Sequence, residues 1–307
     1  MVINMLFTQI KPMLLTLGDE AFDSDDFIYE VKWDGWRIML HKDGKRIEAY
    51  TKNGMHVTDA FPELQDVAKA IKANTAIVDC EGVCIREDTR PSLDDFCYRG
   101  RLRDPAKIKS ATQTHPATFV AFDVLYTNND HTHEPLIDRK KRLQELILPS
   151  DCIVPSMFIE SKGEQLSQLT IEKDLEGIVA KRKDSRYQMG VRSADWIKIK
   201  NYKQIDTVIL GYRTVPSFAL VVGLNFRTVQ NKPVAVVEFG IRQEEKIAFL
   251  EIVRQLHTVK DKTTQWVEPR LCCRIQYRDR TDTHHLREVS FKGFLFDKKP
   301  EECRWIS

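Results

Sequence analysis

The sequence has no apolar run long enough to cross a bilayer. Its longest nearly uninterrupted one, residues 218–226, is far shorter than the roughly 18 to 20 residues that a spanning helix needs. The amino terminus also lacks a basic start followed by a sustained apolar stretch and a cleavage site of small residues. We therefore expect neither membrane insertion nor export by that route.

The cysteines lack the spacings of a metal site or a redox pair. Their count of seven is odd, no two of them stand as CxxC, and none forms a zinc-finger pair with a histidine. We therefore expect reduced, cytosolic thiols. Cys80 and Cys84 would share one face of a strand, where core packing is favoured over a structural metal.

Length and charge suggest two parts. The chain has 307 residues, more than an average domain of about 100 to 200, and this favours two compact units. Its 42% apolar and 30% charged residues are typical of a globular protein. Residues 1–201 carry 29 basic and 32 acidic side chains, a net charge of −3, whereas residues 202–307 carry 18 and 13, a net charge of +5. A basic final third suits a polyanion such as nucleic acid, although an ordinary solvated surface can carry the same charge.

Strand and helix patterns are mixed in the first 201 residues. Residues 27–33 and 36–50 are rich in Ile, Val, Tyr and Trp and contain an Asp-Gly turn, which predicts a β-meander. Apolar residues every three or four positions predict helices near 61–71 and 138–148, and we interpret the basic quartet 139–142 as a solvated helix face. Further strands are expected at 76–85, 118–125, 177–182 and 196–200.

The pattern changes after residue 201. Three strand patterns are followed by one helix pattern and then by two more strand patterns, an order that fits a five-stranded oligonucleotide-binding (OB) barrel. The sequence thus predicts an α+β fold, with a mostly antiparallel unit over 1–201, an OB-fold β-barrel over 202–307 and a hinge at 201–205. The predicted elements of the second unit are strands 206–213, 219–228 and 233–241, helix 244–256, and strands 271–279 and 285–294.

The segment Glu30-Val-Lys32-Trp-Asp34-Gly35-Trp-Arg37 is the most informative one. Lys32 and Asp34 would point to one face of a strand, and Gly35 would let the chain turn so that Arg37 returns beside the lysine. A lysine attacks an electrophile only when it is neutral, and its ordinary pKa near 10.4 leaves a deficit of roughly 4 to 5 kcal/mol at neutral pH. Burial and adjacent cations lower that pKa, so the segment predicts a nucleophilic lysine.

This segment resembles the nucleophile motif of the covalent nucleotidyltransferases, which comprise ATP-dependent DNA ligases, RNA ligases and messenger RNA capping enzymes. Four later segments resemble the family's further motifs, in the family's order. Taken singly, they could be edge-strand charges, a core phenylalanine or a wet strand face, but their joint order favours the functional interpretation. They are Asp79-Cys-Glu81-Gly82, Phe119-Val-Ala-Phe122-Asp123-Val-Leu-Tyr126, Leu175-Glu176-Gly177-Ile-Val-Ala-Lys181 and Arg192-Ser193-Ala-Asp-Trp196-Ile-Lys198-Ile-Lys200.

The resemblance implies a role for each motif side chain. Lys32 would carry AMP as lysyl-AMP, and Glu30 would accept a hydrogen from the adenine amino group, which favours ATP over GTP. Phe122 would stack on the purine and Glu81 would bind the ribose, while Glu176 would hold Mg²⁺ or Mn²⁺. The cations would bind phosphates: Arg37, Lys198 and Lys200 those of the nucleotide, Lys298 the pyrophosphate, and Arg37 and Lys52 the 5′-phosphate of a nick.

Over nearly the whole chain, the resemblance is strongest to small bacterial, archaeal and phage DNA ligases and to the ligase module of bacterial end-joining enzymes. It implies an adenylation domain over 1–201 and an OB domain over 202–307. Their activity would be ATP-dependent sealing of 5′-phosphate/3′-hydroxyl nicks in duplex DNA, in repair, replication or recombination. We expect a monomer in the cytoplasm, at the nucleoid, of a prokaryote or phage-infected cell, with end-joining or repair proteins as candidate partners.

Two alternatives remain from the residues alone. The first is an RNA ligase or a capping-type nucleotidyltransferase, because the lysine motif is common to all of them. The second is a non-catalytic nucleic-acid-binding OB protein with an inert core. Glu30 and the turn at Asn53-Gly54 favour the DNA ligase, although Lys52 replaces the arginine expected there and lacks its bidentate fork.

Leu295 departs from the family's last motif, which has an arginine two residues before Asp297-Lys298 to align the pyrophosphate. The variant Leu295→Arg should therefore adenylylate itself faster, because a guanidinium binds phosphate oxygens in pairs. Single-turnover transfer of label from α-labelled ATP measures this rate, with Leu295→Met as the control of similar volume. A rate unchanged in the arginine variant would contradict the expectation.

Overall fold

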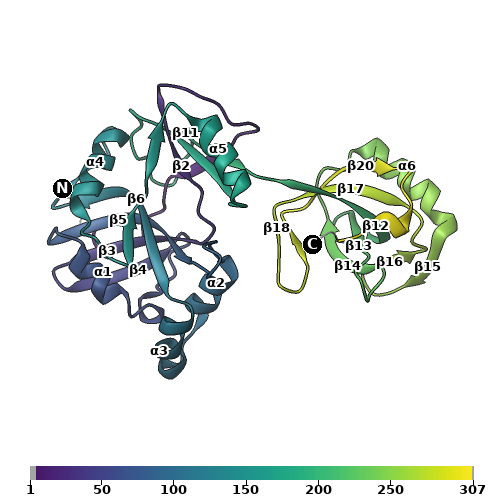
Figure 1. Cartoon of the computed structure of the whole chain (residues 1–307), viewed down its shortest axis with the longest axis horizontal. Coiled ribbons are helices and arrows are strands. Elements are labelled where there is room, and N and C mark those ends of the chain that lie inside the picture. Colours follow the sequence, from purple (N-terminus) through teal and green to yellow (C-terminus); the bar gives the residue numbers. More distant parts are fainter. Residues whose placement is uncertain (1–4, 306–307) are drawn as a thin grey trace. The chain divides into compact units, whose positions relative to one another are not determined.

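The computed structural model describes residues 5–305 and divides into two units, with the break after Asn201. Strand β11 (Arg192–Lys200) ends the first unit and β12 (Lys203–Arg213) begins the second (Figure 1). Three of the five residues predicted as a hinge thus belong to β12. No helix among residues 5–305 is long and apolar enough to span a membrane.

Two β-sheets form the frame of the first unit. One has the strand order β1-β11-β10-β2-β9, and the other has the order β4-β3-β5-β6-β7 with β8 beside β6. The strand pairs of residues 5–201 are antiparallel apart from β1–β11 and β6–β8, which confirms the expected mostly antiparallel unit. The bounds are β1 (Leu14–Leu17), β2 (Phe27–Val31), β3 (Trp36–Asp43), β4 (Arg46–Thr51), β5 (Thr75–Cys84), β6 (Ala117–Thr127), β7 (Asn129–Asp130), β8 (Ile153–Pro155), β9 (Phe158–Glu160) and β10 (Gly177–Arg182).

Helices cover the sheets of the first unit. The two predicted helices are confirmed as α1 (Leu64–Ala70) and α4 (Leu136–Leu146). Three others were not predicted from the sequence: α2 (Leu93–Arg101), α3 (Pro105–Thr114) and α5 (Gly163–Glu172). The main core lies on the side of the six-stranded sheet that faces α1, α2 and α4, and it buries Cys80 and Cys84, as the core-packing interpretation expected.

The predicted β-meander is wrong in its first strand. Strands β3 and β4 form the expected hairpin, but β2 lies in the other sheet, between β10 and β9. Lys32 and Asp34 therefore lie in the connection between the sheets, not on a strand. A Cβ at Gly35 would stand 2.1 Å from the Gly82 carbonyl oxygen, so glycine is required here by a close approach to β5.

The interpretation of the basic quartet on α4 as a solvated face is wrong for its first two residues. Arg139 and Lys140 are 0% and 1% exposed, because acidic partners lie beneath the helix. The guanidinium of Arg139 donates to both carboxylate oxygens of Asp123, at 2.8 and 2.9 Å. Only Lys141 and Arg142 present much of their side chains to solvent, at 70% and 40%.

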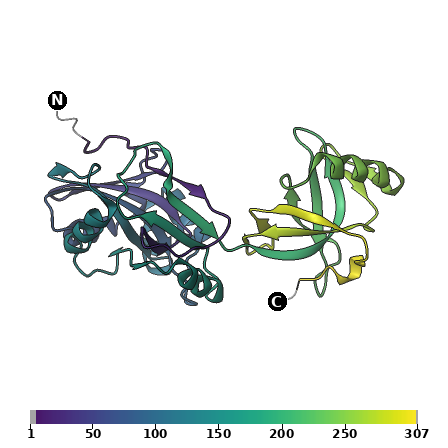
Figure 2. The ribbon, with the colours of Figure 1, turned by 90° about the horizontal axis from the view of Figure 1, so that it is seen from above.

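The described part of the second unit is a curved antiparallel sheet with the helix α6 packed beside it (Figure 2). Its strands run in the order β14-β13-β12-β17-β20, and β16 and β15 continue the sheet from the far end of β12. Among the described residues no pairing joins β14 to β20, so the OB-type sheet is open rather than a closed barrel. The bounds are β13 (Ala219–Leu224), β14 (Lys232–Val237), α6 (Gln243–Val253), β15 (His257–Lys260), β16 (Gln265–Val267), β17 (Cys272–Tyr277), β18 (Asp279–Arg280), β19 (Leu286–Arg287) and β20 (Ser290–Leu295).

The order of three strands, a helix and two strands is confirmed in β12, β13, β14, α6, β17 and β20. The hairpins β15–β16 and β18–β19 were not predicted. Both consist of strands of two to four residues, which are too short to show a reliable alternation of apolar and polar side chains.

The buried pair Arg139–Asp123 gives a prediction about stability. The variant Arg139→Met should lower the free energy of unfolding by about 3 to 5 kcal/mol, because it leaves the Asp123 carboxylate buried without a counter-charge. Urea unfolding followed by circular dichroism measures the change. Lys141→Met, two residues away on the exposed side of the same helix, is the matched control. Equal stability of the two variants would contradict the prediction.

Candidate active site

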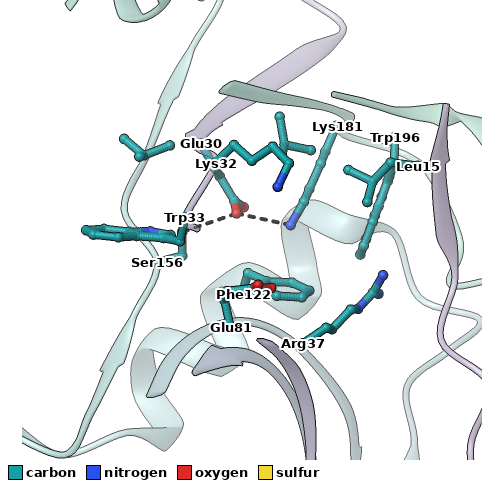
Figure 3. A pocket seen from close by; sticks show the side chains of 12 residues that line it. Leu15, Glu30, Lys32, Trp33, Arg37, Glu81, Phe122, Ser156, Lys181 and Trp196 are labelled. Carbon is teal, nitrogen blue, oxygen red and sulfur yellow. Dashed lines mark hydrogen bonds and ion pairs between the residues drawn. The ribbon is translucent and has the colours of Figure 1, made fainter. Parts of the chain in front are cut away.

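A pocket opens between the two sheets of the first unit (Figure 3). Glu30, Val179, Lys181 and Trp196 come from the five-stranded sheet, and Arg37, Glu81 and Phe122 come from the other. The space between these side chains measures about 470 Å³ when its open mouth is included. The lining residues are Leu15, Glu30, Val31, Lys32, Trp33, Arg37, Glu81, Phe122, Ser156, Val179, Lys181 and Trp196.

Lys32 projects from the loop that connects the two sheets. Its backbone N–H donates to the Gly177 carbonyl at 2.8 Å, which fixes the loop against β10. Its Nζ lies 2.7 Å from Glu176 Oε2, and Lys200 Nζ lies 3.0 Å from Glu176 Oε1. The nearest charged partner of the Lys32 amine is therefore the Glu176 carboxylate, whereas the sequence led us to expect a cation. The expected cation is the next group, because Lys200 contacts the other oxygen of Glu176.

Arg37 is held rigidly on the pocket wall. Its Nε and Nη2 donate to the two oxygens of Asp79 at 3.0 and 2.7 Å, and its Nη1 donates to the Met13 carbonyl at 2.6 Å. Burial lowers the pKa of the guanidinium, but Asp79 raises it further, so the group stays charged. Asp79 is 0% exposed on a central strand, which excludes the interpretation of this residue as an edge-strand solubilising charge.

Glu30 places a negative charge in the wall of the pocket. Its side chain is 3% exposed, and its Oε2 accepts from Lys181 Nζ at 3.0 Å and from Ser156 Oγ at 3.1 Å. Its Oε1 lies 2.7 Å from Lys140 Nζ. Burial raises the pKa of the carboxyl, but Lys140 and Lys181 together outweigh it and hold the pKa below its ordinary value. The group is thus an ionised hydrogen-bond acceptor.

Glu81 is half-buried on β5, and its pKa is raised to about 8. Burial is the largest cause, Lys32 and Arg37 oppose it, and the neighbouring Glu176 and Asp79 add to it. Residues 5–305 contain no group of three or more His, Cys, Asp and Glu that could hold a metal ion by itself. Mg²⁺ typically takes one or two carboxylates and completes its shell with phosphates and water, and the single carboxylate of Glu176 fits that donor set.

Phe122 has different surroundings on its two sides. On one side it packs against a core cluster, with its ring edge-to-face to Trp196 at 6.2 Å, and on the other side it lines the pocket. The Nζ of Lys181 lies 4.4 Å from the Phe122 ring centroid and 4.3 Å from that of Trp196. Burial lowers the pKa of this ammonium to about 8.

The remaining predicted residues, Lys198, Lys52 and Lys298, are not among those that line the pocket. Lys198 is paired in register with the pocket residue Val179, in the strand that also carries Lys200. Lys52 is exposed in the turn after β4, where its N–H donates to the Arg37 carbonyl at 3.2 Å. Lys298 belongs to the second unit, where its Nζ lies 3.3 Å from Asp206.

Lys140, Lys181, Ser156 and Asp79 were not assigned roles from the sequence. Asp79 and Lys181 lie within the quoted motifs, so their positions alone could have drawn attention to them. Nothing in the local pattern distinguishes Lys140 from its exposed neighbour Lys141.

Comparison with known proteins gives one consistent family. A family model described as "ATP dependent DNA ligase domain" matches residues 7–200. The chain is 34% identical over 293 residues to the bifunctional non-homologous end joining protein LigD of Bacillus subtilis, covering 90% of the chain and 48% of the relative. It is 30% identical over 322 residues to a DNA ligase of Thermococcus onnurineus, covering 97% and 55%. The chain thus spans about half the length of these relatives.

Solved structures agree with this result. A structure titled mycobacterial DNA ligase D complexed with ATP and MES is 27% identical, with a TM-score of 0.56, and the match covers 96% of this chain and 97% of that one. The ligase domain from M. tuberculosis LigD is 26% identical, with a TM-score of 0.57 and coverage of 97% and 98%. Both matches therefore extend over the two units of the chain.

The raised pKa of Glu81 predicts a pH dependence of stability. Between the ordinary pKa of 4.5 and the folded value of about 8, the folded chain binds more protons at this site than the unfolded chain. The free energy of unfolding should therefore fall as pH rises through that window. The variant Glu81→Gln should lose this contribution, so the stability of wild type relative to the variant should decrease with pH. Urea unfolding across the window measures it, and parallel pH profiles would contradict it.

Proposed function

The chain belongs to the family of ATP-dependent DNA ligase domains, and on that premise we propose that it joins a 5′-phosphate to a 3′-hydroxyl at nicks in duplex DNA. One observation carries the proposal: the Lys32 amine stands at a pocket that also holds an ionised acceptor, Glu30, and an aromatic ring, Phe122. Residues 1–201 would form the adenylation domain, and residues 202–307 the OB domain that holds DNA.

The first reaction transfers AMP to the protein. Lys32 Nζ attacks the α-phosphorus of ATP, a nitrogen–phosphorus bond forms, and the bond to pyrophosphate breaks. The ammonium must lose its proton before the attack, and Glu176 Oε2 is an acceptor within hydrogen-bond reach at 2.7 Å. Lys198, Lys200 and Lys298 would neutralise the phosphate charges that develop, as phosphoryl transfer requires.

The adenine base would lie in the pocket. Glu30 would accept a hydrogen from its amino group, Phe122 would stack on the ring, and Glu81 would bind the ribose. Mg²⁺ or Mn²⁺ held through Glu176 would supply further neutralisation of the phosphates when bound.

The next two reactions take place on DNA. AMP moves from Lys32 to the 5′-phosphate of the nick, and the 3′-hydroxyl then displaces AMP to form the phosphodiester. We propose that Arg37 and Lys52 bind the 5′-phosphate. Because Asp79 and Met13 occupy most of the Arg37 donors, its contribution would be a fixed positive charge with few free N–H groups.

Two observations weigh against the alternatives. A capping-type enzyme handles guanine, whose 6-oxo group would face the negatively charged Glu30, and two acceptors repel each other. A non-catalytic binding protein has no use for the Lys32–Glu176–Lys200 cluster inside a pocket. The end-joining role of several relatives suggests DNA break repair, with end-joining proteins as candidate partners.

The variant Lys32→Ala should form no covalent adduct with AMP. Incubation with α-labelled ATP and Mg²⁺, followed by a denaturing gel, should label the wild type at residue 32 and leave the variant at background. Lys173→Ala, an exposed lysine of the same unit, should label like the wild type. A label on another residue would overturn the assignment of the nucleophile.

Labelled wild-type protein should then convert a nicked DNA duplex into a sealed strand and release AMP. The same assay on a nicked RNA duplex separates the DNA ligase from the RNA ligase. If the protein seals the nicked RNA duplex in preference to the nicked DNA duplex, it is an RNA ligase and the proposal of a DNA ligase is wrong.

A further inference from the structure

Lys140 lies behind the pocket and not in its wall. It projects from α4, its side chain is 1% exposed, and it is not among the residues that line the pocket. A buried ammonium is costly unless each of its hydrogens has an acceptor. The groups that surround the Lys140 ammonium therefore indicate the role of this residue.

One carboxylate and two backbone carbonyls surround the ammonium of Lys140. Its Nζ lies 2.7 Å from Glu30 Oε1, 3.2 Å from the Phe122 carbonyl and 3.3 Å from the Ser156 carbonyl. The two carbonyls accept hydrogen bonds from the ammonium, and the Glu30 carboxylate forms an ion pair with it. Glu30 belongs to β2 and Phe122 to β6, so the Lys140 side chain joins the two sheets behind the pocket.

Lys181 differs from Lys140 in this respect. It also binds Glu30, through Oε2 at 3.0 Å, but it lines the pocket and lies over the rings of Phe122 and Trp196. Lys181 thus faces the pocket and its two rings, whereas Lys140 donates to two backbone carbonyls outside the pocket. The orientation of the carboxylate is therefore set from the Lys140 side.

We propose that Lys140 is a positioning residue for nucleobase selectivity: by holding Glu30 from outside the pocket, it presents an oriented, charged acceptor to the 6-amino group of the base. The inference rests on the proposed function and deepens it, because it names the residue behind the choice of a 6-aminopurine triphosphate over a 6-oxopurine one.

Loss of Lys140 would weaken this selectivity for two reasons. The carboxylate would lose the contact that fixes its plane, and it would lose one of the two charges that keep it ionised against burial. A protonated carboxyl can donate to a 6-oxo group, so the repulsion of inosine or guanine would turn into a hydrogen bond.

The test compares three nucleotides as adenylylating substrates of the full chain: ATP, ITP, which has a 6-oxo group, and purine riboside triphosphate, which lacks a 6-substituent. In Lys140→Met, the preference for ATP over purine riboside triphosphate, measured as single-turnover adduct formation at subsaturating nucleotide, should fall about tenfold. The use of ITP relative to ATP should rise. Lys140→Arg, which keeps the charge, should restore most of the preference.

Each result decides between a positioning and a merely structural role. The matched control Lys141→Met, one residue away on α4 and 70% exposed, should retain the wild-type preference. In the background Glu30→Gln, adding Lys140→Met should change the preference little, because both act through the same hydrogen bond. If Lys140→Met slows all three nucleotides by one common factor, the residue only supports the fold and the inference is overturned. If the wild type forms no adduct with any nucleotide, the proposed function fails as well, and the two failures are thereby distinguished.

Discussion

The charges of Glu30, Arg37 and Arg139 are largely or fully buried in the first unit, and each lies within hydrogen-bond distance of a group of opposite charge. Removing such a charge from water is costly, so each of these groups requires its partner in a fixed position. The partners come from distant segments: Lys140 from α4, Asp79 from β5 and Asp123 from β6. These ion pairs therefore join the two sheets and α4 close to the candidate active site. They hold the side chains of the pocket wall in fixed positions.

Local sequence patterns predicted the elements better than their arrangement. Alternation located β5, β6 and β10, and the helical periodicity located α1 and α4. Strand β2 was placed in the wrong sheet, because its partner β10 lies about 150 residues later and no local pattern encodes that pairing. Helices α2 and α3 begin at the capping residues Ser92 and Asp104, signals that were present in the sequence and were overlooked. Helix α5 has no capping side chain at its start, so that signal was absent there.

The candidate site was predicted mainly through resemblance, and the structure adds its electrostatics. Motif residues such as Lys32, Glu81 and Glu176 lie in one cluster, and their roles stay predictions. The sequence could not reveal that Lys32 pairs with a carboxylate, or that Lys140 is buried while Lys141 is exposed. Burial of a lysine depends on an acceptor from another part of the chain, here Glu30, more than 100 residues away. Such pairs become visible only once the sheets are in place.

The contact between Gly35 and Gly82 has a consequence for the evolution of the chain. Gly35 gives the loop of Lys32 its close approach to β5, and a Cβ at Gly82 would in turn stand 2.2 Å from the ring of Phe96. Neither glycine can acquire a side chain unless its neighbours shift. Divergence of the loop that carries Lys32 is thus constrained by the backbone of β5, and a smaller residue at position 96 would make room for a side chain at Gly82 but not at Gly35.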